Sequence, residues 1–117
     1  MAFKFENLKV WQDALRLTNE VNLLVKDFPK DEMYSLCTQL KRAADSVVLN
    51  IAEGSTGQSV AEFKRCLGIV LRSAVEVVSC FFIARDRKYI TQEIFHLYYN
   101  EYELLCKKIT KLRASLE

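Results

Sequence analysis

Glycine and proline are scarce in this chain of 117 residues, which has three glycines and one proline. A β-rich fold needs turn residues about every 8–12 positions, so their scarcity argues against many short strands. It predicts a few long helices joined by short connections. The length suits one domain with a single core, and half of the residues are hydrophobic, as in an ordinary globular protein.

The residues that most often carry catalysis or bind metals are also few. The only histidine is His96, and the four cysteines are far apart and form no Cys-x-x-Cys pair. A zinc site is therefore excluded, as is a di-iron bundle, which needs Glu-x-x-His on two helices. We interpret Cys37, Cys66, Cys80 and Cys106 as small core or interface residues in a reducing compartment.

The sequence also shows no signal peptide for secretion and no phosphate-binding loop. The first residues, MAFKFENLKV, lack the apolar segment of a signal peptide, so we expect a cytoplasmic protein. No glycine-rich phosphate loop is present. We expect no enzymatic activity and no cofactor.

What the chain does have is helical periodicity. Apolar residues recur three or four positions apart over four segments, 8–28, 32–53, 59–87 and 91–116. Short links between long helices place consecutive helices antiparallel. We therefore predict an all-α fold in which residues 1–117 form a single domain, an antiparallel up-down-up-down four-helix bundle.

Local signals mark where these helices begin and end. Asp31 is a candidate N-cap of the second helix, Ser59 begins a capping box with the acid three positions later, and Thr91 precedes the fourth helix. Gly54 stands where a helix C-terminus commonly takes a left-handed residue, and 55–58 is predicted to be a turn.

The longest apolar run, residues 66–84, contains only two charges, Arg72 and Glu76. Three hypotheses account for it: a membrane span, a monomer with exposed apolar residues, and a homo-oligomer that buries a second face of the helix. A membrane span would place both charges near the middle of the bilayer, where inserting a charged side chain costs about 2.5–3.5 kcal/mol. It would also leave the three other amphipathic helices without a helix to pack against.

We favour the homo-oligomer because surplus apolar stripes occur on at least two helices rather than at scattered positions. Arg72 and Glu76 lie four positions apart, where they can pair with each other. The residues predicted to lie at the oligomer interface are Leu49, Ile69, Arg72, Glu76, Cys80, Ile83, Phe95, Tyr99 and Tyr102.

A few isolated polar residues are candidates for chemistry. His96 falls on the polar face of the fourth helix and is interpreted as solvated. Glu101 falls in the apolar sector of that helix, where pairing with a lysine or a tyrosine hydroxyl is favoured over catalysis. For Asn50 and Glu53 we favour a structural role over ligand binding, with Trp11, a lysine or a turn amide as the partner of Glu53.

Three stretches carry a family resemblance: FENLKVWQDALRL at 5–17, FPKDEMYSL at 28–36 and QLKRAADSVVLNIAEGS at 39–55. Together they resemble the four-helix-bundle proteins of the bacterial 23S rRNA intervening-sequence family. The chain is similar also to accessory proteins of diversity-generating retroelements, which bind nucleic acid and a reverse transcriptase through a basic surface. The resemblance implies a ring-like homopentamer without enzymatic activity, for which nucleic-acid binding is the usual proposal.

Basic residues supply the one candidate binding surface. In an up-down bundle the start of the third helix and the end of the fourth lie at one end, together with Lys4 and Lys9. The predicted nucleic-acid-binding residues are Lys64, Arg65, Lys107, Lys108, Lys111 and Arg113. The competing interpretation is a solvated face whose cations stabilise a helix C-terminus.

The sequence thus favours a non-enzymatic homo-oligomeric bundle that binds nucleic acid, RNA foremost, and mostly without sequence specificity. The alternative is a protein-interaction scaffold that organises a partner such as a nucleic-acid-processing enzyme, with no direct contact to nucleic acid. Neither interpretation involves a membrane. The expected partners are other copies of the chain, RNA or DNA, and a nucleic-acid-processing protein.

Overall fold

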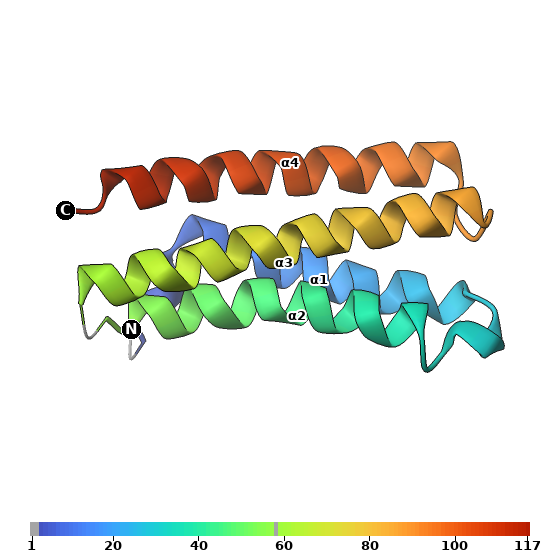
Figure 1. Ribbon diagram of the computed structural model, residues 1–117, viewed down its shortest axis with the longest axis horizontal. Coiled ribbons are helices and arrows are strands. Elements are labelled where there is room, and N and C mark those ends of the chain that lie inside the picture. Colours follow the sequence, from blue (N-terminus) through green and yellow to red (C-terminus); the bar gives the residue numbers. More distant parts are fainter. Residues whose placement is uncertain (1–2, 58) are drawn as a thin grey trace.

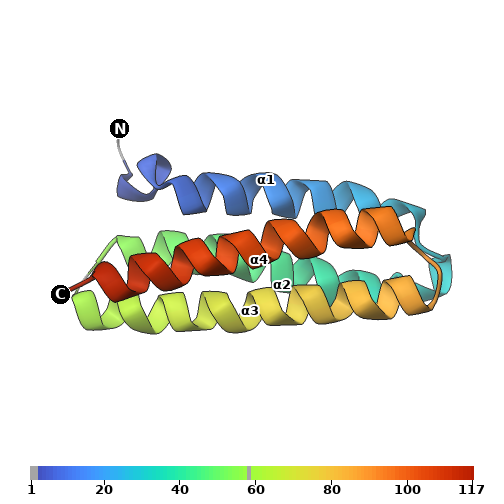
Figure 2. The ribbon, with the colours of Figure 1, turned by 90° about the horizontal axis from the view of Figure 1, so that it is seen from above.

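Four long helices lie side by side in the computed structural model, and consecutive helices run in opposite directions (Figures 1 and 2). They are α1 (Lys9–Leu24), α2 (Leu36–Ser55), α3 (Val60–Asp86) and α4 (Gln92–Ser115). The structure describes residues 3–57 and 59–117, and over these residues the predicted antiparallel four-helix bundle is confirmed. It measures 44 × 23 × 22 Å, its long dimension set by helices that rise about 1.5 Å per residue.

The core is built from the apolar sides of all four helices. Leu17 of α1, Leu40 and Ile51 of α2, Leu67 of α3 and Ile109 of α4 are at most 1% exposed. Burying each such side chain contributes about 1.5–3 kcal/mol relative to leaving it in water. The predicted apolar faces of the helices are therefore the ones that meet inside the bundle.

The first two helices are shorter than predicted, because the link between them contains two 3-10 turns. These are Val25–Asp27 and Lys30–Glu32. Asp31 is therefore not the N-cap of α2; Ser35 occupies that position and makes no side-chain cap bond. Its hydroxyl is engaged elsewhere, since it donates to Oε1 of Glu32 at 2.7 Å.

The predicted caps of the other two helices are confirmed. The Ser59 hydroxyl accepts a hydrogen bond from the backbone N–H of Glu62 at 3.1 Å, and the Thr91 hydroxyl accepts one from that of Ile94, also at 3.1 Å. Each cap satisfies an N–H group that has no partner inside its helix. Of the predicted turn, Gln58 lies outside the described residues.

Gly54 does not have the predicted role of a left-handed helix end. It is buried within α2, which continues to Ser55, and the positive φ of 52° occurs at Gly57 instead. A Cβ atom on Gly54 would lie 2.7 Å from the Cβ atom of Cys66 on α3. This glycine is needed because α2 and α3 approach each other closely.

The seam between α1 and α4 is held largely by polar side chains. Arg16 Nη2 pairs with Glu101 Oε1 at 2.8 Å, and Lys108 Nζ pairs with Asp13 Oδ2 at 3.1 Å. The partner of Glu101 is therefore an arginine of α1, and not the lysine or tyrosine hydroxyl that the sequence suggested.

By length and composition, one helix within the described ranges, α3, could cross a membrane. A core helix of a soluble protein meets the same criteria, and α3 packs against both α2 and α4 with Leu67, Val77 and Phe81 fully buried. This position accounts for the buried side of the apolar run at 66–84, whereas Val75 and Phe82 of the same run remain exposed.

Candidate interaction surfaces

The basic residues singled out in the sequence do gather at one end of the bundle. The start of α3 and the end of α4 lie there beside the first turn of α1 (Figure 1). Half of the six predicted nucleic-acid-binding residues are, however, in ion pairs within the bundle. These pairs are Arg65–Glu62 at 2.6 Å, Lys108–Asp13 at 3.1 Å and Lys107–Glu103 at 4.0 Å.

The Asp13 pair links a predicted cation, Lys108, to another helix, α1. Burial raises the pKa of the Asp13 carboxyl group, but hydrogen bonds from Lys9 and Lys108 outweigh this effect and lower it. Lys108 is thus a structural residue of the α1–α4 seam, and it shares the Asp13 carboxylate with Lys9.

Three of the predicted cations have no ion-pair partner in the part of the chain that the structure describes: Lys64, Lys111 and Arg113. Arg113 Nε donates to the backbone carbonyl of Lys64 at 3.0 Å, which fastens the end of α4 to the start of α3. This contact holds the Arg113 side chain of α4 against the start of α3, where Lys64 lies. We call Lys64, Lys111 and Arg113 the basic end.

A second surface lies along the outside of α3 and α4. Val75 is 66% exposed and Phe82 is 40% exposed, with the half-buried Val78 between them on the same side of α3. Across from them on α4 lie Tyr99 and Cys106, and a groove of about 220 Å³ runs between the helices. We call these five residues the α3–α4 strip.

Three residues of the predicted oligomer interface are not on the surface, and their expected exposure is wrong. Cys80 is 2% exposed, Phe95 is 3% and Tyr102 is 1%. A helix in this bundle touches more than one neighbour, so a wider sector of α3 and α4 is buried inside the subunit than a single core stripe provides. Val75 and Phe82 are among the exposed apolar positions that sequence reasoning missed.

The remaining predicted interface residues are accessible, and they lie on more than one surface. Ile69 is half-buried, Ile83 is 38% exposed, and Leu49 is 56% exposed on α2, away from the groove that Tyr99 lines. Arg72 and Glu76 are exposed but form no ion pair with each other.

Glu76 has a different partner: its carboxylate accepts a hydrogen bond from Gln39 Nε2 of α2 at 3.2 Å. The expected pairing with Arg72 along α3 is thus replaced by a contact between helices.

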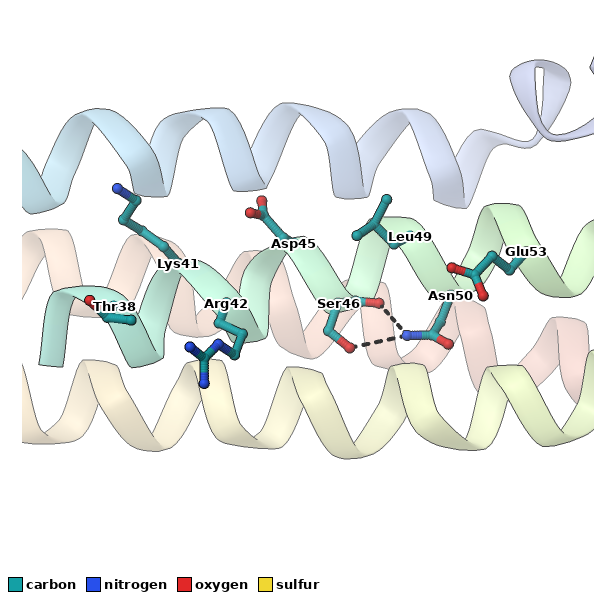
Figure 3. Close-up of a pocket in the computed structure, with 8 residues that line it drawn as sticks. All are labelled: Thr38, Lys41, Arg42, Asp45, Ser46, Leu49, Asn50 and Glu53. Carbon is teal, nitrogen blue, oxygen red and sulfur yellow. Dashed lines mark hydrogen bonds between the residues drawn. The ribbon is translucent and has the colours of Figure 1, made fainter. Parts of the chain in front are cut away.

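Leu49 belongs to an open groove of about 500 Å³ on the outer face of α2 (Figure 3). Lys41 and Asp45 extend from this face toward α1, and Arg42 extends toward α3. Glu53 ends the groove, and among the described residues its carboxylate has no hydrogen-bond partner, so none of the proposed partners is found. The groove is lined by two cations, Lys41 and Arg42, followed along α2 by two acids, Asp45 and Glu53, so its charges favour no single ligand charge.

Asn50 has the structural role that we favoured from the sequence. Its Nδ2 donates to the backbone carbonyl and the hydroxyl of Ser46, at 2.9 and 3.1 Å (Figure 3). The Ser46 hydroxyl is in turn 2.9 Å from the Ser73 hydroxyl of α3. This polar chain fixes the register of α2 against α3.

Residues 3–57 and 59–117 offer little chemistry of the catalytic kind. They contain no group of three side chains that could hold a metal ion. His96 is exposed, with its Nε2 atom 3.1 Å from the amide nitrogen of Gln92. Burial raises the pKa of the Cys80 thiol to about 11, so at neutral pH it stays protonated and unreactive.

Comparison with known proteins agrees with the fold and the sequence motifs. The family model of the 23S rRNA-intervening sequence protein matches residues 6–111. A crystal structure of a protein with unknown function from the S23 ribosomal protein family of Bacteroides thetaiotaomicron superposes with a TM-score of 0.81 at 24% identity, over 89% of this chain and 97% of that one. No curated protein matches. Neither description names a catalytic activity, and the chain belongs to the 23S rRNA-intervening sequence protein family.

Proposed function

We propose that this protein is a non-enzymatic, homo-oligomeric helical bundle of the cytoplasm that binds nucleic acid, RNA foremost, through its basic end. The observation that carries the proposal is that Arg113 of α4 is held against Lys64 of α3, and that neither of them, nor Lys111 in the last turns of α4, has a carboxylate partner in the described structure. Unpaired cations at one end of a rigid bundle suit contacts to phosphate, which supply most of non-specific nucleic-acid affinity.

Three cations make a weak site in one subunit, so the proposal includes self-association. The α3–α4 strip presents apolar side chains along two helices, and burying it against another copy would remove it from water. A closed oligomer repeats the basic end by symmetry. Simultaneous phosphate contacts from several subunits then raise the affinity far above that of one subunit.

The test is binding of a labelled RNA, measured by fluorescence anisotropy over a series of salt concentrations. Replacing Lys64 and Lys111 by glutamine should weaken binding and reduce the salt dependence, by up to about 0.9 in the log–log slope for each duplex phosphate that is no longer neutralised. Lys88→Gln, at the opposite end of the bundle, is the matched control and should bind as the wild type does. Absence of wild-type binding, or equally weakened binding in the control, refutes the proposal.

A second candidate function rests on the α3–α4 strip alone: a scaffold that binds a partner protein without touching nucleic acid. Native mass spectrometry of protein purified without nuclease separates the two functions. A homo-oligomer that carries nucleic-acid mass supports the first, and an oligomer free of nucleic acid favours the scaffold. A monomer would contradict the self-association on which the first function depends.

A further inference from the structure

A pocket of about 390 Å³ lies at the end of the bundle opposite the basic end, where α1 gives way to α2. Its size falls in the range of small-molecule sites, about 300–1,000 Å³. The pocket is formed where the last turns of α1, the link through Pro29 and the first turns of α2 meet. It is separate from the α3–α4 strip and from the outer groove of α2 except for Lys41, which borders both the pocket and that groove.

The pocket has an apolar floor. Val25 is 7% exposed, Phe28 is 6% and Cys37 is 7%, and all three line it. The Cys37 thiol is already used, since it donates to the backbone carbonyl of Val25 at 3.7 Å. The floor therefore offers contact to an apolar body and no free polar group of its own.

The rim of the pocket is cationic. Lys26 and Lys30 from the link and Lys41 from α2 line it, and no carboxylate is among the lining residues. None of these three lysines has an ion-pair partner in residues 3–57 and 59–117. Lys41 extends from α2 toward α1 (Figure 3).

The start of α2 adds to the positive potential. Cys37 is in the first turn of this 20-residue helix, whose N-terminus carries a partial positive charge. A lone phosphate would contact only the rim, whose three lysines are exposed, and a neutral apolar molecule would contact only the floor. A ligand with an apolar body and an anionic head contacts both.

We propose that this pocket binds a small organic anion, an apolar body that ends in a single carboxylate or phosphate. The apolar body lies on Val25, Phe28 and Cys37, and the anionic head is held by the ammonium groups of the rim through charge-assisted hydrogen bonds. Lysine suits this task because its long stem places a point charge over an apolar surface. The proposal is independent of nucleic-acid binding, which uses the other end of the bundle.

The test is a titration of the isotope-labelled full chain by NMR with octanoate and octyl phosphate. Octanol serves as the neutral control, and acetate and inorganic phosphate as controls without the apolar body. We expect saturable shifts of amide signals around Val25, Phe28 and Cys37 for at least one of the two octyl anions, and the tighter of the two identifies the head group. Octanol should bind roughly tenfold more weakly or worse, because it cannot form a charge-assisted hydrogen bond with the rim.

Lysine variants test which ammonium groups bind the anionic head of the ligand. Lys30→Gln and Lys41→Gln should each weaken binding several-fold, whereas Lys88→Gln, which removes the same charge outside the pocket, should not. The NMR spectrum of each variant shows directly that it is folded. Equal binding of octanol, saturation at the α3–α4 strip instead, or equally weakened binding in Lys88→Gln would overturn the proposal.

Discussion

In the part of the bundle that the structure describes, some polar side chains form several hydrogen bonds, and others form none. Glu32, in the link between α1 and α2, accepts hydrogen bonds from Tyr89 at 2.6 Å, Ser35 at 2.7 Å and Arg87 at 2.8 Å. These hydrogen bonds tie two connections of the bundle together. The Tyr102 hydroxyl, in contrast, is buried with no hydrogen-bond partner among the described residues.

Tyr102→Phe should stabilise the protein. A buried polar group without a partner costs about 1–3 kcal/mol, and removing it restores part of that cost, so we expect a gain of about 1 kcal/mol in the free energy of unfolding. Urea denaturation followed by circular dichroism measures it. Tyr98→Phe is the matched control: its hydroxyl donates to Glu20 at 2.9 Å, so its loss should destabilise. If the free energy of unfolding changed in the same direction in both variants, the Tyr102 hydroxyl would not be the unpaired group that we describe.

The network around Glu32 predicts an acid-sensitive contribution to stability. Hydrogen bonds from Tyr89 and Ser35, with the charge of Arg87, lower the pKa of Glu32 to about 2. Because the folded-state pKa lies below the unfolded one, the stabilisation is complete above the ordinary glutamate range near pH 4.5 and is lost as the pH falls toward 2.

Melting temperatures of the wild type and Glu32→Gln, measured from pH 7 down to pH 2, test this prediction. The wild type should melt higher at neutral pH, and the difference should shrink through the acid range. A difference that does not depend on pH would mean that the carboxylate charge plays no part.

At the scale of elements, the distance between neighbouring helices determines whether a glycine is required at a given position. Gly54 was expected to end α2 but lies inside it, because α3 passes too near for a side chain. Gly68 of α3 is also helical, yet the nearest atom to a Cβ placed there is Arg113 Nη2 at 3.7 Å. The two glycines look alike in the sequence and differ only in what lies opposite them.

Alanine at these two glycines should therefore have opposite effects. Gly68→Ala should raise the free energy of unfolding by about 0.5–1 kcal/mol, the helix-propensity difference between the residues. Gly54→Ala should lower it, because the new Cβ would lie 2.7 Å from that of Cys66 and 2.9 Å from the Phe63 ring, a case of overpacking that typically costs about 1–3 kcal/mol. Thermal and urea unfolding of the two variants measure the effects, and stabilisation by Gly54→Ala would show that α2 and α3 have room to separate.

At the scale of the whole molecule, the bundle buries its core stripes and still presents an apolar strip on α3 and α4. Its polar attachments are unevenly placed: ion pairs hold α1 to α4, whereas a glycine contact and a serine pair join α2 to α3. The outer side of α3 and α4 is therefore an apolar surface available to another subunit.

Val75→Glu should convert the proposed homo-oligomer to a monomer. Val75 is 66% exposed, so the change should alter the stability of the subunit by no more than about 0.5 kcal/mol, while a charge buried at an interface without a partner opposes association. Light scattering after size exclusion measures the mass. Leu23→Glu on α1, where the leucine is 62% exposed, is the matched control and should leave the oligomer intact. Equal masses for Val75→Glu and the wild type would exclude the strip as the interface.

Much of the fold was predictable because its signals are local. The apolar periodicity of each segment and the caps at Ser59 and Thr91 act within a few residues of the chain, and these predictions are confirmed. The start of α2 was misplaced because the Ser35 hydroxyl bonds to Glu32 rather than to the helix. The gathering of Lys64, Lys111 and Arg113 at one end also followed from helix direction alone.

The sequence by itself determined that the chain forms four antiparallel helices with an apolar stripe on each, because helix periodicity and capping depend on near neighbours in the chain. Only the tertiary structure decided which sides of those helices face water. It buried Cys80, Phe95 and Tyr102, exposed Val75, and left three lysines around one apolar pocket. The physical reason is that burial and ion pairing depend on the distance and orientation of neighbouring helices, which the sequence of one helix does not contain.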